Sequence, residues 1–359
     1  MSDIAYRVFA ADKTPLGEVR SLTSAQWLEI YDDVGELKLV CGVTALTKQL
    51  LQRGHLLQNT DRPHLLARIC SVVIDDDAKA AKMTVRAKMT VQMWDDRVLM
   101  YTAELADSEQ GILNIASDNQ RELPCSVAAA KGIGTAISKQ ISWGSVLDAA
   151  INTAQEHGLG LRNIVDEVTL AEVLEVYKGV DRTNPAGADY VGYIGRDSGT
   201  LGTVKITDAD NGAKNVAIVC GDGEGAARTV VRVDLPKGAP ARELYVDARN
   251  ISRKYTVTAA DGTESEATHT DAEYEQLLRA EGMQALLDNG LTLTLSAELQ
   301  QRQMLLGRDY DLGDILPMQL TQYGLYAKVR IQRITMVTEA NKSSITAALE
   351  ILEVLETWQ

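Results

Sequence analysis

Residues 214–228, near the middle of the chain, have the composition of a phosphate-binding loop. They read KNVAIVCGDGEGAAR, an apolar run followed by Gly221, Gly223 and Gly225. In a dinucleotide-binding loop such glycines are followed by a helix whose N-terminus faces the pyrophosphate. Here β-branched, alternating residues follow, and two acidic residues between the glycines would repel a phosphate. We therefore predict that the glycines turn the chain between two strands of a hairpin.

An acidic segment, DYDLGD at residues 309–314, has the side chains that bind calcium. Carboxylate oxygens are the ligands that a hard cation prefers. The spacing does not fit a calcium-binding loop, because its fifth position is Gly313 and its twelfth, which needs a bidentate Glu, is Leu320. The segment is therefore predicted to be a turn that leads into a strand at residues 315–320.

The sequence shows no pattern typical of a catalytic or metal site. No H-E-x-x-H motif and no close His/Cys cluster is formed by the four histidines, which are His55, His64, His157 and His269. The G-x-S-x-G motif is also missing, and a triad of His64, Cys70 and an aspartate would be one arbitrary combination among many. We predict no catalytic residue, no cofactor and no metal ligand.

The cysteines indicate a reducing compartment. Cys41, Cys70, Cys125 and Cys220 are far apart and form no C-x-x-C pair, so we expect reduced thiols. The N-terminus lacks a basic region followed by an apolar core, and no apolar run approaches 18 residues. We expect synthesis in a cytosol and no membrane span.

Charge and length restrict the class of protein further. Fifty acidic residues against 36 basic ones give a net charge of -14, which repels the phosphates of nucleic acids. The chain also has only one Phe, so it offers few rings on which bases could stack. Sequence-specific nucleic-acid binding is therefore not expected. A length of 359 residues predicts two or three domains.

The elements that must position these residues are mostly strands. Apolar and polar residues alternate at 36–40 and 83–91, the period of a half-buried strand, and a short helix near 46–51 ends before Gly54. Strands are also predicted at 169–177, 190–194, 203–207, 215–219 and 229–235, spaced as in a meander with Asn211-Gly212 at a tight turn.

Two amphipathic helices interrupt the strands. The first follows a capping box of Ser145 and Asp148 and ends before Gly158. The second covers 271–288, with Thr270 and Glu273 as its capping box. Beyond it, 291–315, 328–335 and 344–354 are predicted strands, although the last also contains good helix formers. Long crossover helices are missing, so we predict an α+β, mainly antiparallel β protein.

Several segments occur in a distinctive order along the chain. They are WLEIYDDVGELKL (27–39), LLQRG (50–54), YKGVDRT (177–183), the glycine segment (214–228), RELYVDAR (242–249), YDLGDI (310–315) and VRI (329–331). Together they cover nearly the whole chain, and in this order they resemble the Gp37-like tail hub proteins of long-tailed bacteriophages. The residues that carry the resemblance as a structural signature are Gly35, Tyr177, Gly179, Asp181, Arg182, Asn215, Gly221, Gly223, Arg228, Glu243, Gly313 and Asp314.

The resemblance implies a particular architecture. A hub of this family would contain two small β-barrel domains with helical insertions and would assemble as a homotrimer. For this chain that means a first barrel at residues 1–100, a helical or α+β domain at 101–180, and a second barrel at 181–359 with a helical insertion at about 236–290.

The resemblance also implies a role in the virion. A tail hub closes the end of the tail tube, and its partners are the distal tail ring, the tape-measure protein, and receptor-binding or fibre proteins. It is not an enzyme. Two other classes stay open on the residues alone: a tail-associated peptidase or cell-wall hydrolase, and a nucleotide-binding protein that uses the glycine segment.

Overall fold

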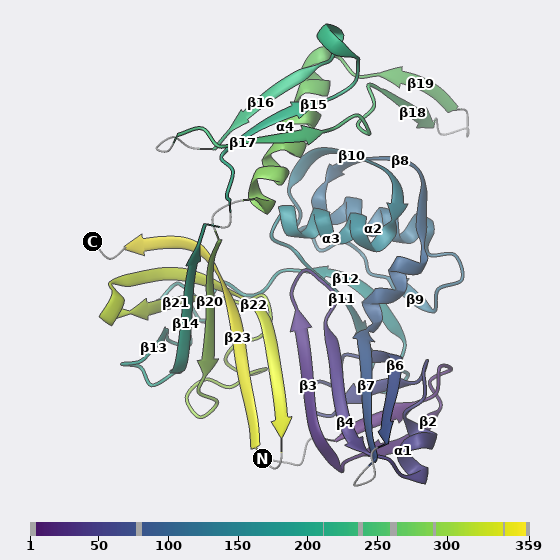
Figure 1. The fold of residues 1–359 in the computed structure, drawn as a ribbon, viewed down its shortest axis with the longest axis vertical. Helices are drawn as coiled ribbons and strands as arrows, with labels where there is room; N and C mark the ends of the chain where they lie inside the picture. The colour runs from purple at the N-terminus through teal and green to yellow at the C-terminus, as the bar shows by residue number, and fades with distance from the viewer. Residues whose placement is uncertain are drawn as a thin grey trace.

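The computed structural model describes residues 5–76, 81–210, 212–235, 240–258, 264–289, 292–339 and 342–356. Mainly antiparallel strands are the largest class of regular structure in this part of the chain, and helices cover smaller regions (Figure 1). The predicted class, α+β with mainly antiparallel β structure, is therefore confirmed.

The largest sheet contains strands from both ends of the chain. Its order is β14-β20-β23-β22-β3-β4-β7-β6-β5-β1-β2, with β21 beside β22 and β13 beside β21. The strands are β1 (Tyr6–Phe9), β2 (Pro15–Val19), β3 (Leu22–Ile30), β4 (Glu36–Gly42), β5 (Leu56–Asn59), β6 (Ala67–Asp76), β7 (Ala81–Met89), β13 (Ile194–Gly195), β14 (Leu201–Ala209), β20 (Thr292–Leu299), β21 (Ile315–Leu320), β22 (Leu325–Glu339) and β23 (Lys342–Glu356). The short helix α1 (Ala45–Leu50) and the 3-10 turns η1 (Thr90–Asp96) and η3 (Thr321–Tyr323) connect some of them.

Strand β22 joins the two halves of this sheet. Its first part pairs with β21, as at Val329 and Leu316, and its second part pairs with β3, as at Met336 and Trp27. On its other side β23 pairs with it along nearly its whole length. A register shift between Ile331 and Arg333 separates the two parts, and such irregularities let a strand bend. One strand thus serves both halves.

The sheet runs as an open path within the described residues. At its two ends β14 and β2 each have one partner strand, so neither of the two predicted barrels closes there. The division into two barrels consequently stays a prediction.

The middle of the chain forms a compact segment beside the sheet (Figure 1). It contains β8 (Val98–Asp107), α2 (Ser108–Asn119), β9 (Cys125–Val127), β10 (Ala136–Ser145), α3 (Val146–Glu156), β11 (Gly160–Val165) and β12 (Glu172–Tyr177). Helix α3 lies where predicted, and the Ser145 hydroxyl caps it by accepting a hydrogen bond from the Asp148 amide, which is one half of the predicted capping box. Helix α2 was not predicted; Asp107 caps it.

A second, smaller module is inserted between β14 and β20. It contains β15 (Val216–Cys220), η2 (Gly225–Ala227), β16 (Val230–Asp234), β17 (Glu243–Asp247), β18 (Lys254–Thr258), β19 (Glu264–Thr268) and α4 (Asp271–Asp288). Helix α4 has the predicted bounds, and Thr270 and Glu273 cap each other. Its buried side packs on β15 and β16, with Tyr274 and Leu278 in a hydrophobic core separate from that of the main sheet.

Several predicted elements need correction. The meander is wrong, because β13 pairs with β21, β14 pairs with β20, and β15 belongs to a different sheet; Asn211 lies outside the described residues. The strand predicted at 190–194 is reduced to Ile194–Gly195, and the one at 169–177 starts at Glu172. The strand at 83–91 ends at Met89, where η1 begins. The helix alternative for 344–354 is wrong, since β23 is a strand.

Candidate functional site

The glycine segment is a hairpin turn, as predicted. Strand β15 pairs with β16 in antiparallel register, and Gly223 and Gly225 between them have φ of 103° and 55°. Gly221 serves a different purpose, because a Cβ there would lie 2.6 Å from the Tyr274 hydroxyl oxygen. Only a three-residue 3-10 turn follows, so no helix N-terminus faces the glycines.

Arg228 fastens this turn to the rest of the inserted module. Its guanidinium donates hydrogen bonds to the carbonyl oxygens of Gly221 (2.9 Å) and Cys220 (2.7 Å) and to the Asp247 carboxylate (2.6 Å). Hydrogen bonds from Arg249 and then from Arg228 lower the pKa of Asp247 to about 2. The guanidinium of Arg228 is therefore already paired with the Asp247 carboxylate and with two backbone carbonyl oxygens.

A second cluster of signature residues joins the middle segment to β21. The Asp314 carboxylate accepts hydrogen bonds from the Val180 amide (2.7 Å) and from Nε of Arg182 (2.8 Å). The backbones of Val180, Arg182 and Ile315 exchange two further hydrogen bonds of 2.9 Å each. DYDLGD is thus a turn before a strand, as predicted, and its last carboxylate anchors the segment that follows β12.

Glycines permit the closest approach in this cluster. A Cβ on Gly179 would lie 2.0 Å from the carbonyl carbon of Gly313, and one on Gly313 would lie 2.3 Å from the Tyr31 ring. Gly313 also has φ of 89°, which disfavours any other residue. The Tyr31 hydroxyl lies 3.1 and 3.2 Å from the carbonyl oxygens of Gly158 and Tyr177. The rings of Tyr31 and Tyr177 also pack edge to face. Tyr31 therefore packs where three parts of the chain meet.

Next to Tyr31, a buried ion-pair cluster connects the N-terminal and C-terminal halves. Arg62, 4% exposed, binds both carboxylate oxygens of Glu29 (2.8 and 2.6 Å) and both of Asp311 (3.2 and 2.7 Å). Glu29, 2% exposed, also accepts a hydrogen bond from the Trp27 indole (2.8 Å). Burial opposes these charges, but the mutual attraction outweighs it, so the pKa of Arg62 is raised and that of Asp311 is lowered.

We name these two adjacent groups the junction: Glu29, Tyr31, Arg62, Tyr177, Gly179, Arg182, Asp311, Gly313 and Asp314. Sequence reasoning missed Glu29, Tyr31 and Arg62 as a cluster, because their partners lie up to 249 residues away in the chain. The only sign of this cluster in the sequence was the presence of Gly179 and Gly313, which lie beside it in the structure.

The predicted signature residues therefore do not form one site. Tyr177, Gly179, Arg182, Gly313 and Asp314 lie at the junction, and Asp181 lies beside it in a bridge to Ile315. Asn215, Gly221, Gly223, Arg228 and Glu243 belong to the inserted module. Gly35 lies in the β3–β4 turn, where a Cβ would come within 2.3 Å of the Leu28 carbonyl oxygen. Whether these residues define the family stays a prediction.

Groups that could do chemistry are few in the structure. Burial, then the charge of Arg62, lowers the pKa of His64 to about 4. Within the described part of the chain, no three His, Cys, Asp or Glu side chains are grouped to hold a metal ion. No helix in that part is long and apolar enough to cross a membrane.

Comparison with known proteins identifies the fold. The family model described as Siphovirus ReqiPepy6 Gp37-like protein matches residues 5–349. The structure resembles a tail protein from Neisseria meningitidis MC58 (TM-score 0.61, 12% identity, 98% of this chain and 97% of that one). It also resembles the prophage MuSo2 43 kDa tail protein from Shewanella oneidensis (0.59, 11%, 96% and 98%) and prophage tail protein gp18 from Listeria monocytogenes EGD-e (0.53, 12%, 97% and 94%). No curated protein matches the chain. At these identities the structural likeness shows a shared fold.

Proposed function

The chain belongs to the family of Siphovirus ReqiPepy6 Gp37-like proteins, and we propose that within it the chain serves as a structural tail hub. In this proposal it closes the end of the tail tube in the virion. It holds the distal tail ring on one side and receptor-binding or fibre proteins on the other, and the tape-measure protein ends against it. The fold shared with phage tail proteins supports this role.

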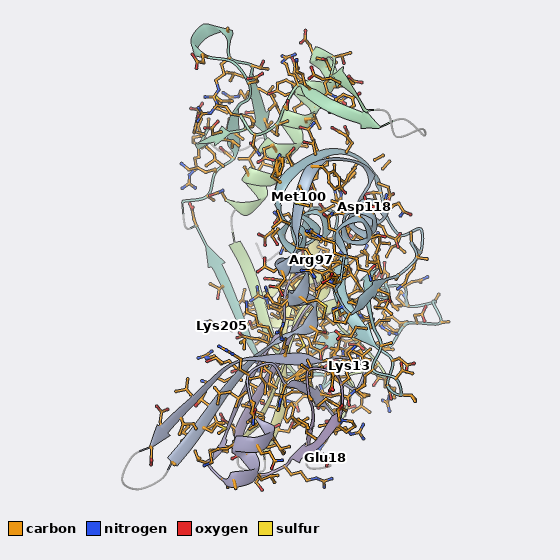
Figure 2. All side chains as sticks on the ribbon, turned by 90° about the vertical axis from the view of Figure 1, so that its right-hand side faces the viewer. Lys13, Glu18, Arg97, Met100, Asp118 and Lys205 are labelled. Carbon is orange, nitrogen blue, oxygen red and sulfur yellow. The ribbon has the colours of Figure 1, made fainter. Side chains whose placement is uncertain are left out.

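The observation that carries the proposal is the continuous sheet with unpaired edges. Strand β14 at one end and β2 at the other lack an outer partner in the described structure. Beyond Ile69, β6 also has a free edge, because β5 pairs with it at Ala67 and Arg68 and the residues before β5 hydrogen-bond to Ile69, and this end of the β6–β7 hairpin projects from the molecule (Figure 2). Open edges are completed by neighbouring strands, which copies in a closed ring can supply. Three copies would form the proposed homotrimer.

The proposed domain division follows the same logic. Residues 1–100 and 181–359 would each supply one half of the sheet as a barrel-like unit, with 101–180 as the helical domain. The inserted module would lie between β14 and β20, which pair with each other and so return the chain to the sheet where it left. Two such units in each of three copies would match a six-fold tube.

An exposed apolar patch supports contact with another tail protein. Trp143 on β10 is 67% exposed and Met100 on β8 is 57% exposed, and Val98 lies on the same face of β8 as Met100 (Met100 is labelled in Figure 2). Tyr101 lies on the other face of β8, where its hydroxyl donates a hydrogen bond to Asp118. Trp143 also has φ of 50°, a conformation that a bulky residue adopts at a cost. Exposed Trp, Tyr and Met are the residues that interfaces favour.

Light scattering on the purified protein tests the assembly. We expect the mass of three 39.0 kDa chains, with the monomer appearing only on dilution. A protein that stays monomeric even with a tail-tube extract would contradict the hub. Release of fragments from host cell walls, abolished in a heat-denatured sample, would instead favour the peptidase or hydrolase class, and saturable nucleotide binding would favour the nucleotide-binding class.

A further inference from the structure

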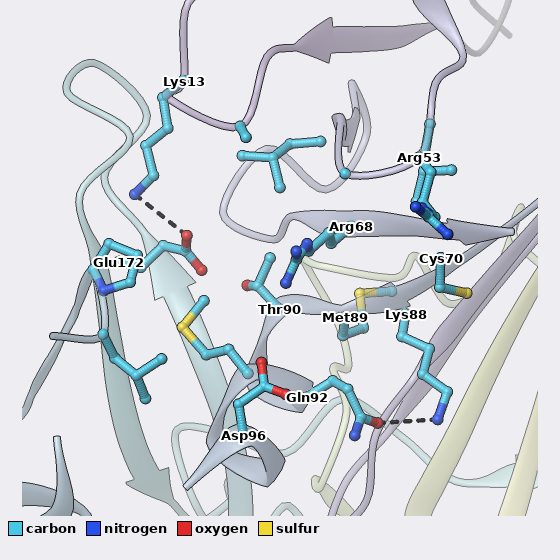
Figure 3. A pocket seen from close by; sticks show the side chains of 17 residues that line it. Lys13, Arg53, Arg68, Cys70, Lys88, Met89, Thr90, Gln92, Asp96 and Glu172 are labelled. Carbon is cyan, nitrogen blue, oxygen red and sulfur yellow. Dashed lines mark hydrogen bonds and ion pairs between the residues drawn. The ribbon is translucent and has the colours of Figure 1, made fainter. Parts of the chain in front are cut away.

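The structure contains a cavity of about 550 Å³ between the N-terminal half of the sheet and the middle segment. Its walls come from the β1–β2 and α1–β5 loops, the strands β5, β6 and β7, the turn η1, the residues before β9, and the start of β12. Figure 3 shows Arg53, Arg68 and Lys88 on one side of it, with Lys13 and Glu172 across. Cavities of this size are typical of small-molecule sites.

The protein neutralises only part of the positive charge in this cavity. Lys13 forms an ion pair with Glu172 (3.3 Å), and Lys88 donates a hydrogen bond to the amide oxygen of Gln92 (3.0 Å). Arg53 and Arg68 have no ion pair or side-chain hydrogen bond within the described structure. Four cations against two carboxylates in the lining leave a formal charge of +2, in a chain whose net charge is -14.

The rest of the lining is largely apolar. Leu56, Ile69 and Met89 line the cavity from the sheet, and Met93 and Leu123 line it from the middle segment. An apolar body could replace water against these side chains, which would contribute about 25 cal/mol per Å² buried. A carboxylate or phosphate near Arg53 and Arg68 could accept charge-assisted hydrogen bonds, since a guanidinium presents a planar set of donors.

We propose that this cavity binds a small amphipathic anion, with its carboxylate or phosphate group held by Arg53 and Arg68 and its apolar part against the methionine and leucine side chains. The described lining contains no aromatic ring on which a base could stack, so it does not favour a nucleic acid. Its volume and its apolar wall also distinguish it from a merely solvated group of surface cations. The inference does not depend on the hub role.

Calorimetric titration of the full chain tests the site with octyl phosphate, octanoate and the uncharged octanol as probes. One saturable site per chain is expected for at least one of the two anions, with octanol binding at least tenfold more weakly. Binding of the phosphate alone or of the carboxylate alone would each support the proposal and identify the head group. Competition by sodium chloride is expected because the contact is charged.

Variants locate the binding in the cavity. Arg53→Gln with Arg68→Gln should weaken the anion at least tenfold. Lys38→Gln is the matched control, because Lys38 is an exposed cation on the neighbouring strand β4 that does not line the cavity, and it should stay within twofold of the wild type. Equal binding of octanol, no saturable binding of any probe, or an unchanged affinity in the double variant would each overturn the proposal, provided that circular dichroism shows the variants folded.

Discussion

The junction and the cavity treat their cations in opposite ways. At the junction Arg62 is 4% exposed and fully paired with Glu29 and Asp311, whereas at the cavity Arg53 and Arg68 are exposed and unpaired in the described structure. A buried charge needs partners inside the protein, because it has lost its water, but an exposed charge is solvated and stays free to bind a ligand. The difference indicates that the junction maintains the fold and that the cavity is available for binding.

Removing the central cation of the junction should have the largest effect. Arg62→Met leaves Glu29 buried without a counter-charge, which typically costs about 3–5 kcal/mol of unfolding free energy. Urea denaturation followed by circular dichroism measures the loss. The double variant Arg62→Met with Glu29→Gln should recover part of it, and a loss below about 1 kcal/mol in the single variant would show that the pair contributes little.

Closing the glycine contact should rank second. Gly313→Ala forces φ of 89° on alanine and places a methyl group 2.3 Å from Tyr31, so we expect a loss of roughly 3 kcal/mol. Gly307→Ala is the matched control, because Gly307 has φ of 81° but no atom within 4 Å of its Cβ position. The difference between the two denaturation midpoints isolates the steric part, and equal midpoints would refute the close packing on Tyr31.

A pH titration should show an effect of intermediate size at His64, which lies near enough to Arg62 of the junction for that charge to affect its pKa. The pKa of His64 falls from 6.5 to about 4 on folding, mainly through burial, so the unfolded chain binds a proton that the folded one does not. The stability it supports is therefore complete above pH 6.5 and is lost as pH falls toward 4, by at most roughly 3 kcal/mol.

The check on this titration is His64→Asn, in which that loss between pH 6.5 and 4 should disappear. His55→Asn keeps His64 and should retain the wild-type slope. If both variants follow the wild type, His64 is not the group that titrates.

The smallest effect on stability is expected at the cavity. Arg68→Gln removes a side chain with no partner in the described structure, so the free energy of unfolding should change by less than about 0.5 kcal/mol, as at most surface positions. Urea denaturation measures this change. A loss comparable to that of Arg62→Met would show that Arg68 supports the fold, and the contrast between the two regions would fail.

Local signals in the sequence predicted local structure well. Thr270 and Glu273 predicted the start of α4, and Ser145 with Asp148 predicted that of α3, because a capping box involves neighbours within one turn. The glycine hairpin followed from alternation after Gly225. In each case the physical cause lies within a few residues of its effect.

Long-range structure was predicted less well, for a physical reason. Arg62 and Asp311 meet only because β22 joins the ends of the chain in one sheet, and no local pattern encodes that pairing. The same applies to β17, whose parallel pairing with β15 requires a crossover that the meander spacing did not suggest. The sequence shows that positions 179 and 313 are glycines, but only the packing around Tyr31 and between the two glycines explains why a larger side chain does not fit there.

Strand β22 has a mechanical consequence. Because it is bonded on both sides along most of its 15 residues, a tension directed along the strand would load many hydrogen bonds together in shear instead of opening them one after another. A force perpendicular to the strand would instead load the hydrogen bonds between β22 and its neighbours one after another. The chain would thus resist stretching much better in one direction than in another.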